Sequence, residues 1–426
     1  MNQQLFSYIA ACPTAYQAVS HTAGMLEEAG FTPLREADDW HVVPGKDYYV
    51  TRNASSLIAF RIPESGLGPF RMAAAHGDSP SFKIKENAEN PSGAYVRLDT
   101  EKYGGMLCAS WMDRPLSVAG RVVVRTEAGI ETRLVDLKEP CALIPSVAIH
   151  MNRKANEGYA YDPAVDMLPL WQGGGFRRRI ADAAGVTEEA LLSTDLFLYN
   201  PQPGAAWGDY ISAPRLDDLQ CAFAALTGFL AAAPQAGVPV FCFFDNEEVG
   251  SETKQGAAST FLWDVLSRLA GGDLPRLLAS SFLVSCDNAH AIHPNHPELA
   301  DKNHAPVLNG GVVVKYNASQ RYTTDAVSAA VFGLCCEKAG VRVQRYANRA
   351  DLAGGSTLGS IANIQVSVNA VDVGLPQLAM HSAFETAGAR DTEALGRALA
   401  VFYRGSLEAL GDGAYRLVLP EGGERI

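Results

Sequence analysis

The chain has 426 residues, a length typical of two or three domains or of one large domain with an insertion. Apolar residues make up 47% and charged residues 19%, so the chain can build a sizeable core and is not generally disordered. The 47 acidic residues outnumber the 35 basic ones and give a formal charge of −12, which argues against a general nucleic-acid binder.

The first half of the chain is predicted to contain one helix and several short strands. Residues 14–29 carry apolar side chains at helical spacing and stop at Gly30. Residues 56–62 and 71–76 read as strands. Three further β-rich segments, separated by glycine or polar turns, are predicted strands of a β-rich region: 94–99, 121–125 and 132–137.

The second half alternates between helices and apolar strands. A long helix at 217–233 is followed by buried strands at 238–244 and 281–286. A helix at 325–339 and a strand at 366–373 complete the pattern. Such alternation indicates an α/β fold with a mostly parallel sheet covered by helices on both faces.

The eight cysteines and the apolar segments bear on the location of the protein. The cysteines form no CxxC pair, so no zinc finger or thioredoxin-like site is indicated, and buried free thiols are expected. The N-terminus lacks the pattern of a secretory signal. The longest apolar stretch, from Cys221, is cut by Pro234 and Pro239, which is too short for a membrane span. We therefore expect a soluble cytoplasmic protein without membrane or nucleic-acid partners.

Polar clusters follow the predicted buried strands. Four of them lie at 76–78, 245–248, 287–290 and 380–382, and a fifth, at 215–218, opens the long helix. In open α/β sheets, ligands bind beyond the carboxyl ends of the strands, so we expect these clusters to converge on one site.

The side chains in these clusters suit a pair of divalent transition metal ions, zinc first. With one bridging carboxylate, two ions need five or six protein ligands, which the clusters supply as His76, Asp217, Glu248, Asp287 and His381. Asp78 lies two residues from His76 and is expected to fix its tautomer. Of the neighbours Glu247 and Glu248, one is expected to bind metal and the other to move protons. Taken singly, each cluster also fits a solvated turn or a helix cap.

Eight segments resemble the aspartyl aminopeptidases, di-metal enzymes that remove acidic residues from peptide N-termini. The long stretches FDNEEVGSE and VGLPQLAMHS carry most of this resemblance. The segments occur in the family's order and span nearly the whole chain, at 75–85, 144–153, 211–218, 244–259, 285–298, 313–322, 354–359 and 371–382.

The resemblance implies a role for each site residue. His76, Asp217 and Asp287 would hold one metal, and Asp217 would bridge to a second metal completed by Glu248 and His381. Glu247 would be the general base, and Asp78 would orient His76. The implied mechanism is attack of a metal-bound hydroxide on the first peptide bond. The histidines at 290, 293, 296 and 304 are predicted to be loop residues and not metal ligands.

The resemblance also implies an architecture and an assembly. A zinc-peptidase-like catalytic domain (1–90 plus 205–426) would carry an inserted β-rich dimerisation domain (91–204). Dimers would build a tetrahedral dodecamer, and His150 would reach an active site across the dimer. Lys315 would meet the acidic side chain of the substrate. The ordinary alternative for His150 is a buried structural histidine, and the ordinary alternative for Lys315 is a surface lysine.

The chain departs from the family pattern at three positions. Asp218 stands where Asn is usual, Gly77 where Thr is common, and Phe384 where an Arg is usual after His381. None of these changes removes a ligand or the base, but the missing Arg puts a strict acidic preference in doubt. Two alternatives therefore stay open: a related di-metal amidohydrolase or broader aminopeptidase, and a scaffold without activity.

Overall fold

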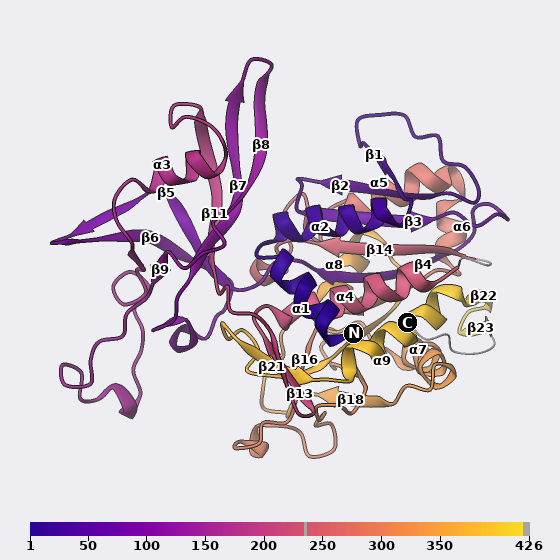
Figure 1. The fold of residues 1–426 in the computed structure, drawn as a ribbon. Coiled ribbons are helices and arrows are strands. Elements are labelled where there is room, and N and C mark those ends of the chain that lie inside the picture. Colours follow the sequence, from indigo (N-terminus) through magenta and orange to yellow (C-terminus); the bar gives the residue numbers. More distant parts are fainter. Residues whose placement is uncertain (234–236, 421–426) are drawn as a thin grey trace.

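The structure, a computed structural model, describes residues 1–233 and 237–420 and shows two lobes (Figure 1). The larger lobe carries the N-terminus and is built on a nine-stranded sheet in the order β1-β2-β3-β14-β4-β15-β19-β17-β18. Its strands are β1 (Thr32–Leu34), β2 (Asp47–Arg52), β3 (Ser56–Arg61), β4 (Phe70–His76), β14 (Val238–Phe244), β15 (Phe282–Cys286), β17 (Val312–Tyr316), β18 (Val343–Ala347) and β19 (Asn369–Gly374).

The centre of this sheet is parallel. Strands β14, β4, β15 and β19 are neighbours and run in one direction, whereas β3 and β17 flank them antiparallel. All seven residues of β14 and of β4 are buried, as expected for parallel strands covered on both faces. The prediction of a mostly parallel α/β sheet is confirmed.

Helices cover both faces of the nine-stranded sheet. Side chains of β14 alternate between two cores, with Phe241 and Phe243 in one and Val240 and Cys242 in the other. The first core includes α1 (Asn2–Ala11), α2 (Ala15–Glu28), α4 (Leu216–Ala231), α7 (Ala326–Lys338) and α9 (Asp391–Arg404). The second includes α5 (Phe261–Ala270), α6 (Leu274–Leu278) and α8 (Leu358–Gln365).

The smaller lobe is a seven-stranded antiparallel sheet in the order β8-β7-β11-β5-β6-β10-β9, with α3 (Phe176–Ala183) beside it (Figure 1). It has its own apolar core, which includes Phe82 and Trp111. Its strands are β5 (Ser81–Ser92), β6 (Tyr95–Tyr103), β7 (Ser117–Thr126), β8 (Gly129–Asp136), β9 (Ala142–Leu143), β10 (Leu170–Trp171) and β11 (Leu191–Tyr199). We call it the β-rich lobe.

The ends of this sheet differ from the boundaries expected for the insertion. The predicted insertion, 91–204, begins near the end of β5, whereas β5 belongs to the β-rich lobe from Ser81 onward. The second half of β5 is polar and partly exposed, so it lacks the apolar run by which the neighbouring strands were recognised.

Two small sheets complete the larger lobe. A five-stranded sheet runs β12-β13-β21-β20-β16, and β22 pairs with β23 in a hairpin. Their strands are β12 (Ala205–Trp207), β13 (Tyr210–Ala213), β16 (Ala289–His290), β20 (Pro376–Leu378), β21 (Glu385–Gly388), β22 (Ser406–Gly411) and β23 (Ala414–Val418). The five-stranded sheet joins segments next to three of the predicted metal ligands, because β13 precedes Asp217, β16 follows Asp287 and β20 precedes His381.

Most predicted elements agree with the structure within a few residues. Helix 14–29 corresponds to α2, and strand 238–244 matches β14. Strand 366–373 is β19, which begins only at Asn369, and helix α1 was not predicted. All eight cysteines are free. Within the described ranges, no helix has both the length and the apolar character that crossing a membrane requires.

Candidate metal centre

Three of the predicted clusters meet at the carboxyl edge of the nine-stranded sheet. His76 is the last residue of β4, and Asp287 directly follows β15. Glu247 and Glu248 lie in a short 3₁₀ turn, η3 (Glu247–Val249), after β14. Because β14, β4 and β15 are adjacent and parallel, these side chains come from neighbouring strand ends.

Asp217 and His381 reach the same place from outside this sheet. Asp217 lies in the first turn of α4, where its backbone is not helical (φ −80°, ψ 107°). His381 follows β20 and has a φ of +65°, a left-handed conformation that costs a residue with a side chain about 1–2 kcal/mol. The surrounding contacts must hold this conformation.

Asp217 lies between the two imidazoles. His76 Nε2 is 3.5 Å from Asp217 Oδ1, and His381 Nε2 is 3.4 Å from Asp217 Oδ2. Asp287 Oδ1 lies 3.9 Å from His76 Nε2, and Glu248 Oε2 lies 3.5 Å from His381 Nε2. Each oxygen of Asp217 therefore faces a different imidazole, which is the arrangement a bridging carboxylate requires.

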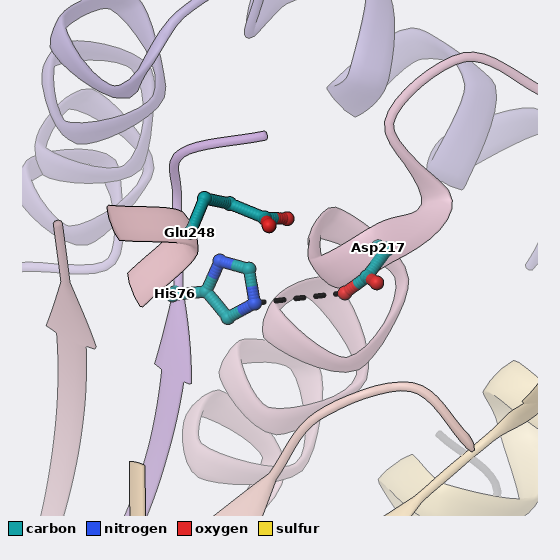
Figure 2. A group of neighbouring side chains, drawn as sticks. All are labelled: His76, Asp217 and Glu248. Carbon is teal, nitrogen blue, oxygen red and sulfur yellow. Dashed lines mark ion pairs between the residues drawn. The ribbon is translucent and has the colours of Figure 1, made fainter. Parts of the chain in front are cut away.

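The residues fit a metal site because several buried atoms lack ordinary partners. His76 Nε2, Asp217 Oδ1 and Glu248 Oε1 are buried, and none has a hydrogen-bond partner within residues 1–233 and 237–420. Ligand atoms of these three residues lie within 4.8 Å of one another, as do those of Asp217, Asp218 and Asp287. Figure 2 shows the His76 ring, with its ion pair to Asp217, and Glu248 beside it. Unpaired buried polar atoms are costly, and a cation would satisfy them together.

The electrostatics of the cluster also favour a cation. Burial raises the pKa of Glu247 to about 8, and burial together with Asp217 raises the pKa of Glu248 well above its usual value. Burial also raises the pKa of Asp217, but the imidazoles of His381 and His76 beside it outweigh burial and leave that pKa below its usual range. Divalent cations would compensate this excess of buried carboxylates.

Asp78 makes more contacts than the sequence predicted. His76 Nδ1 lies 3.1 Å from the Asp78 backbone carbonyl and 3.4 Å from its carboxylate, so Nε2 faces the cluster. The same carboxylate accepts hydrogen bonds from the backbone N–H groups of Glu247 and Glu248, each at 3.1 Å. Asp78 therefore ties the His76 strand end to the turn that carries both glutamates.

Lys315 lies at the cluster, but His150 does not contact it. Lys315 is 3% exposed, its Nζ donates to the Asn288 carbonyl at 2.9 Å, and it lies 3.5 Å from Asp287 Oδ2. Burial lowers the pKa of Lys315, but the neighbouring acidic groups, Asp287 first among them, together outweigh burial and raise the pKa, so the ammonium stays charged. His150 lies on an exposed turn of the β-rich lobe, and no hydrogen bond or ion pair joins it to the cluster in the described part of the chain.

A cavity of about 200 Å³ opens beside the cluster. Its wall includes Lys315, His290 and several residues of the cluster itself. Further lining residues are Asp217, Glu247, Asp287, Tyr322, Tyr346, Thr357, Met380 and His381. A substrate in this cavity would touch both the cluster and the buried ammonium group.

The structure gives a physical reason for one departure from the family pattern and adds a residue that the sequence did not reveal. A Cβ on Gly77 would lie 2.7 Å from Phe243 Cζ, so the Phe243 ring occupies the space that a side chain at position 77 would need.

Glu385, at the start of β21, accepts from the backbone N–H of Asp217 at 3.0 Å and of His381 at 2.7 Å. An isolated glutamate in an HSAFE segment carries no sequence signal for this role.

An α/β sheet with imidazoles and carboxylates at its carboxyl edge, several with unpaired ligand atoms, is typical of metal-dependent hydrolases. A family model described as "Aminopeptidase I zinc metalloprotease (M18)" matches residues 8–403, so the chain belongs to the M18 aminopeptidase family. Aspartyl aminopeptidases are part of this family, and the resemblance seen in the sequence is confirmed.

Similar proteins cover nearly the whole chain. A "Probable M18 family aminopeptidase 2" from Clostridium novyi is 41% identical over 91% of this chain and 95% of its own length. One from Pseudomonas paraeruginosa is 41% identical over 95% and 98%. The structure described as "Cryo-EM structure of the Ape4 and Nbr1 complex" has a TM-score of 0.91 at 31% identity, covering 94% of this chain and 85% of that one. The S. cerevisiae mApe1 dodecamer has a TM-score of 0.81 at 27% identity, covering 93% and 94%. The chain is thus a metal-dependent aminopeptidase, and zinc is the metal in the family's description.

Proposed function

We propose that this aminopeptidase releases N-terminal Asp or Glu residues from peptides, using two zinc ions. His76 and Asp287 would hold one ion, Glu248 and His381 the other, and Asp217 would bridge them. The observation that carries the proposal is the position of Asp217, whose two oxygens lie 3.5 Å and 3.4 Å from different imidazoles.

The protein's own groups divide the chemical work. When bound, the zinc ions would polarise the scissile carbonyl and lower the pKa of a water molecule. Glu247 lines the cavity, and its Oε2 lies 3.9 Å from His76 Nε2, beside the ligands. It would accept the water's proton and return it to the leaving amine. Asp78 would keep Glu247 in place through the hydrogen bond to its backbone N–H.

Lys315 would select the acidic side chain. A carboxylate entering the cavity loses water, and a buried ammonium group on the wall compensates that loss. Lys315 already forms an ion pair with Asp287, 3.5 Å away, so less of its charge is left for a substrate carboxylate. This observation favours a second candidate, an aminopeptidase with broader, non-acidic specificity. Phe384, in place of a cationic residue, supports the same alternative.

The chain would work as a homo-oligomer. The similar mApe1 structure from S. cerevisiae is a dodecamer of that protein, and we propose dimers and a tetrahedral dodecamer here as well. In such a dimer, His150 on the β-rich lobe would reach the neighbouring site. Its exposed position leaves it free for that contact. The cytoplasmic location stays a prediction.

Initial rates on a panel of aminoacyl substrates would test the proposal. The panel would carry Asp, Glu, Leu, Ala or Lys at the N-terminus, with zinc, manganese or cobalt supplied. We expect the highest kcat/KM for Asp and Glu, and no hydrolysis of matched peptides with acetylated N-termini. Faster release of Leu than Asp would reject the acidic preference and favour the broader enzyme. Cleavage of the acetylated peptides would instead indicate a related amidohydrolase.

A further inference from the structure

A segment of the β-rich lobe lies directly against the metal centre. Residues 103–107, here called the bridging segment, connect β6 to the short helix η1 (Cys108–Trp111). The Gly105 carbonyl lies 2.9 Å from His381 Nδ1, and the Leu107 N–H donates to the His381 carbonyl at 2.9 Å. One residue of the larger lobe is therefore bound at both its ring and its backbone by the β-rich lobe.

These contacts set the chemical state of His381. The Gly105 carbonyl can only accept, so Nδ1 carries a hydrogen, and Nε2 is the nitrogen that can offer a lone pair to a cation. Nε2 is the atom that lies 3.4 Å from Asp217 Oδ2 and 3.5 Å from Glu248 Oε2. The Leu107 bond also helps to hold the left-handed backbone of His381. The bridging segment therefore fixes both the tautomer and the direction of this ring.

Tyr103 extends the same connection to the two glutamates. Its hydroxyl donates to Asp78 Oδ2 at 2.7 Å and accepts from Asn246 Nδ2 at 2.8 Å. Asp78 Oδ2 is also the atom that accepts from the Glu248 N–H. A chain of hydrogen bonds thus leads from the β-rich lobe to the turn that carries Glu248.

Gly104 brings the backbone of the segment close to Glu248. It has a φ of +74°, and a Cβ at this position would lie 3.1 Å from Glu248 Cβ. A side chain here would be strained and would also press on the glutamate. The close approach therefore requires glycine at this position.

We infer that the bridging segment is part of the metal centre and positions Glu248 and His381, so that the affinity for one of the two cations depends on the β-rich lobe. This inference rests on the metal site of the proposed function. All of these contacts lie within one chain, so they are independent of the contact proposed for His150 across a dimer. Tyr103, Gly104 and Gly105 are positioning residues, because they act through Asp78, Glu248 and His381.

Tyr103→Phe tests the inference with little disturbance, because it removes a single oxygen atom. Tyr199→Phe is the matched control: it lies in the same lobe and loses a bond of the same 2.7 Å length, to Asp136. Zinc affinity would be measured on metal-free protein by competition with a chromogenic chelator. We expect one zinc ion to bind roughly tenfold more weakly in Tyr103→Phe, as is usual when an outer partner is lost. Tyr199→Phe should bind zinc like the wild type.

A second pair of variants tests the contact with Glu248. Gly104→Ala and Gly93→Ala both place a side chain at a positive φ, +74° and +62°, but a Cβ on Gly93 meets nothing within 4 Å. We expect weaker zinc binding only for Gly104→Ala. Thermal unfolding of all four variants would separate lost stability from lost affinity, and Tyr103→Phe decides the question if Gly104→Ala does not fold.

The outcomes distinguish this inference from the proposed function. Suppose that the wild type binds two zinc ions and that folded Tyr103→Phe binds both with the affinity of the wild type. The bridging segment then has no role in the metal centre, and the proposed function stands. If the wild type binds no zinc, the metal site itself is rejected. An equal loss of affinity in Tyr103→Phe and Tyr199→Phe would also overturn the inference, because it would reflect general loosening of the lobe.

Discussion

The two halves of the metal centre are built differently. His76 and Asp287 stand at the ends of adjacent parallel strands, each fixed by the backbone ladder of the buried sheet. His381 stands on a loop, and its ring is bound by a carbonyl group 276 residues away in the chain. Ligands at strand ends need little outside support, whereas a ligand on a loop depends on whatever covers it. The contacts of the β-rich lobe with His381 therefore make this half of the site depend on a second lobe.

The largest effect is expected where the two halves meet. Asp217→Asn should lower zinc content and abolish measurable activity, because a neutral amide cannot balance two dications. The loss should exceed the roughly 10- to 100-fold that follows removal of an outer partner. Zinc content would be measured by elemental analysis beside the rates. Asp218→Asn is the comparison: its carboxylate accepts from the His76 N–H at 3.2 Å, an amide oxygen can also accept that bond, and a much smaller loss is expected. Full activity of Asp217→Asn would reject the bridge.

Glu247→Gln removes proton transfer while leaving both halves of the site in place. Activity should fall roughly 10²- to 10⁴-fold because the amide cannot accept the water's proton. Zinc content and unfolding temperature should stay as in the wild type. Glu252→Gln, at an exposed position in the following turn, serves as the control. Near-normal turnover with full zinc content would remove Glu247 from the mechanism.

His150→Ala addresses the role of the β-rich lobe across a dimer. If His150 donates to a neighbouring site, activity should fall roughly 10²-fold in intact oligomers, the usual cost of one lost stabilising donor. Mixing with Glu247→Gln subunits should restore part of the activity, because hybrid dimers would contain one complete site. His296→Ala, on an exposed loop of the larger lobe, is the control. Hybrids that form without recovering activity would favour a site completed within one chain.

Lys315→Met should have the smallest effect and the most selective one. A net contribution of about 1–2 kcal/mol corresponds to a roughly 5- to 30-fold lower kcat/KM for Asp and Glu substrates. Ala and Leu substrates should change much less, and Lys302→Met at an exposed position should change nothing. An equal loss for all substrates would instead assign Lys315 to holding Asp287, which lies 3.5 Å from its ammonium group.

The sequence by itself determined the class of fold and the identity of the clustered residues. Apolar runs such as 238–244 mark buried parallel strands because every side chain in them is covered, and a polar residue ends each run where the chain leaves the sheet. Since parallel strands end at one edge, His76, the two glutamates and Asp287 had to lie near one another once the strands were adjacent. The roles of individual ligands came from the family resemblance, and they remain proposals.

Only the tertiary structure decided which distant groups hold the ligands. Glu385 accepts from the backbone of both Asp217 and His381, and Gly105 and Tyr103 reach the site from another lobe. None of these residues has a periodic pattern or a motif, because the contacts join segments that are far apart in the chain. The geometry of these contacts depends on how the two lobes pack. That packing is a property of the whole fold, so no local stretch of sequence predicts it.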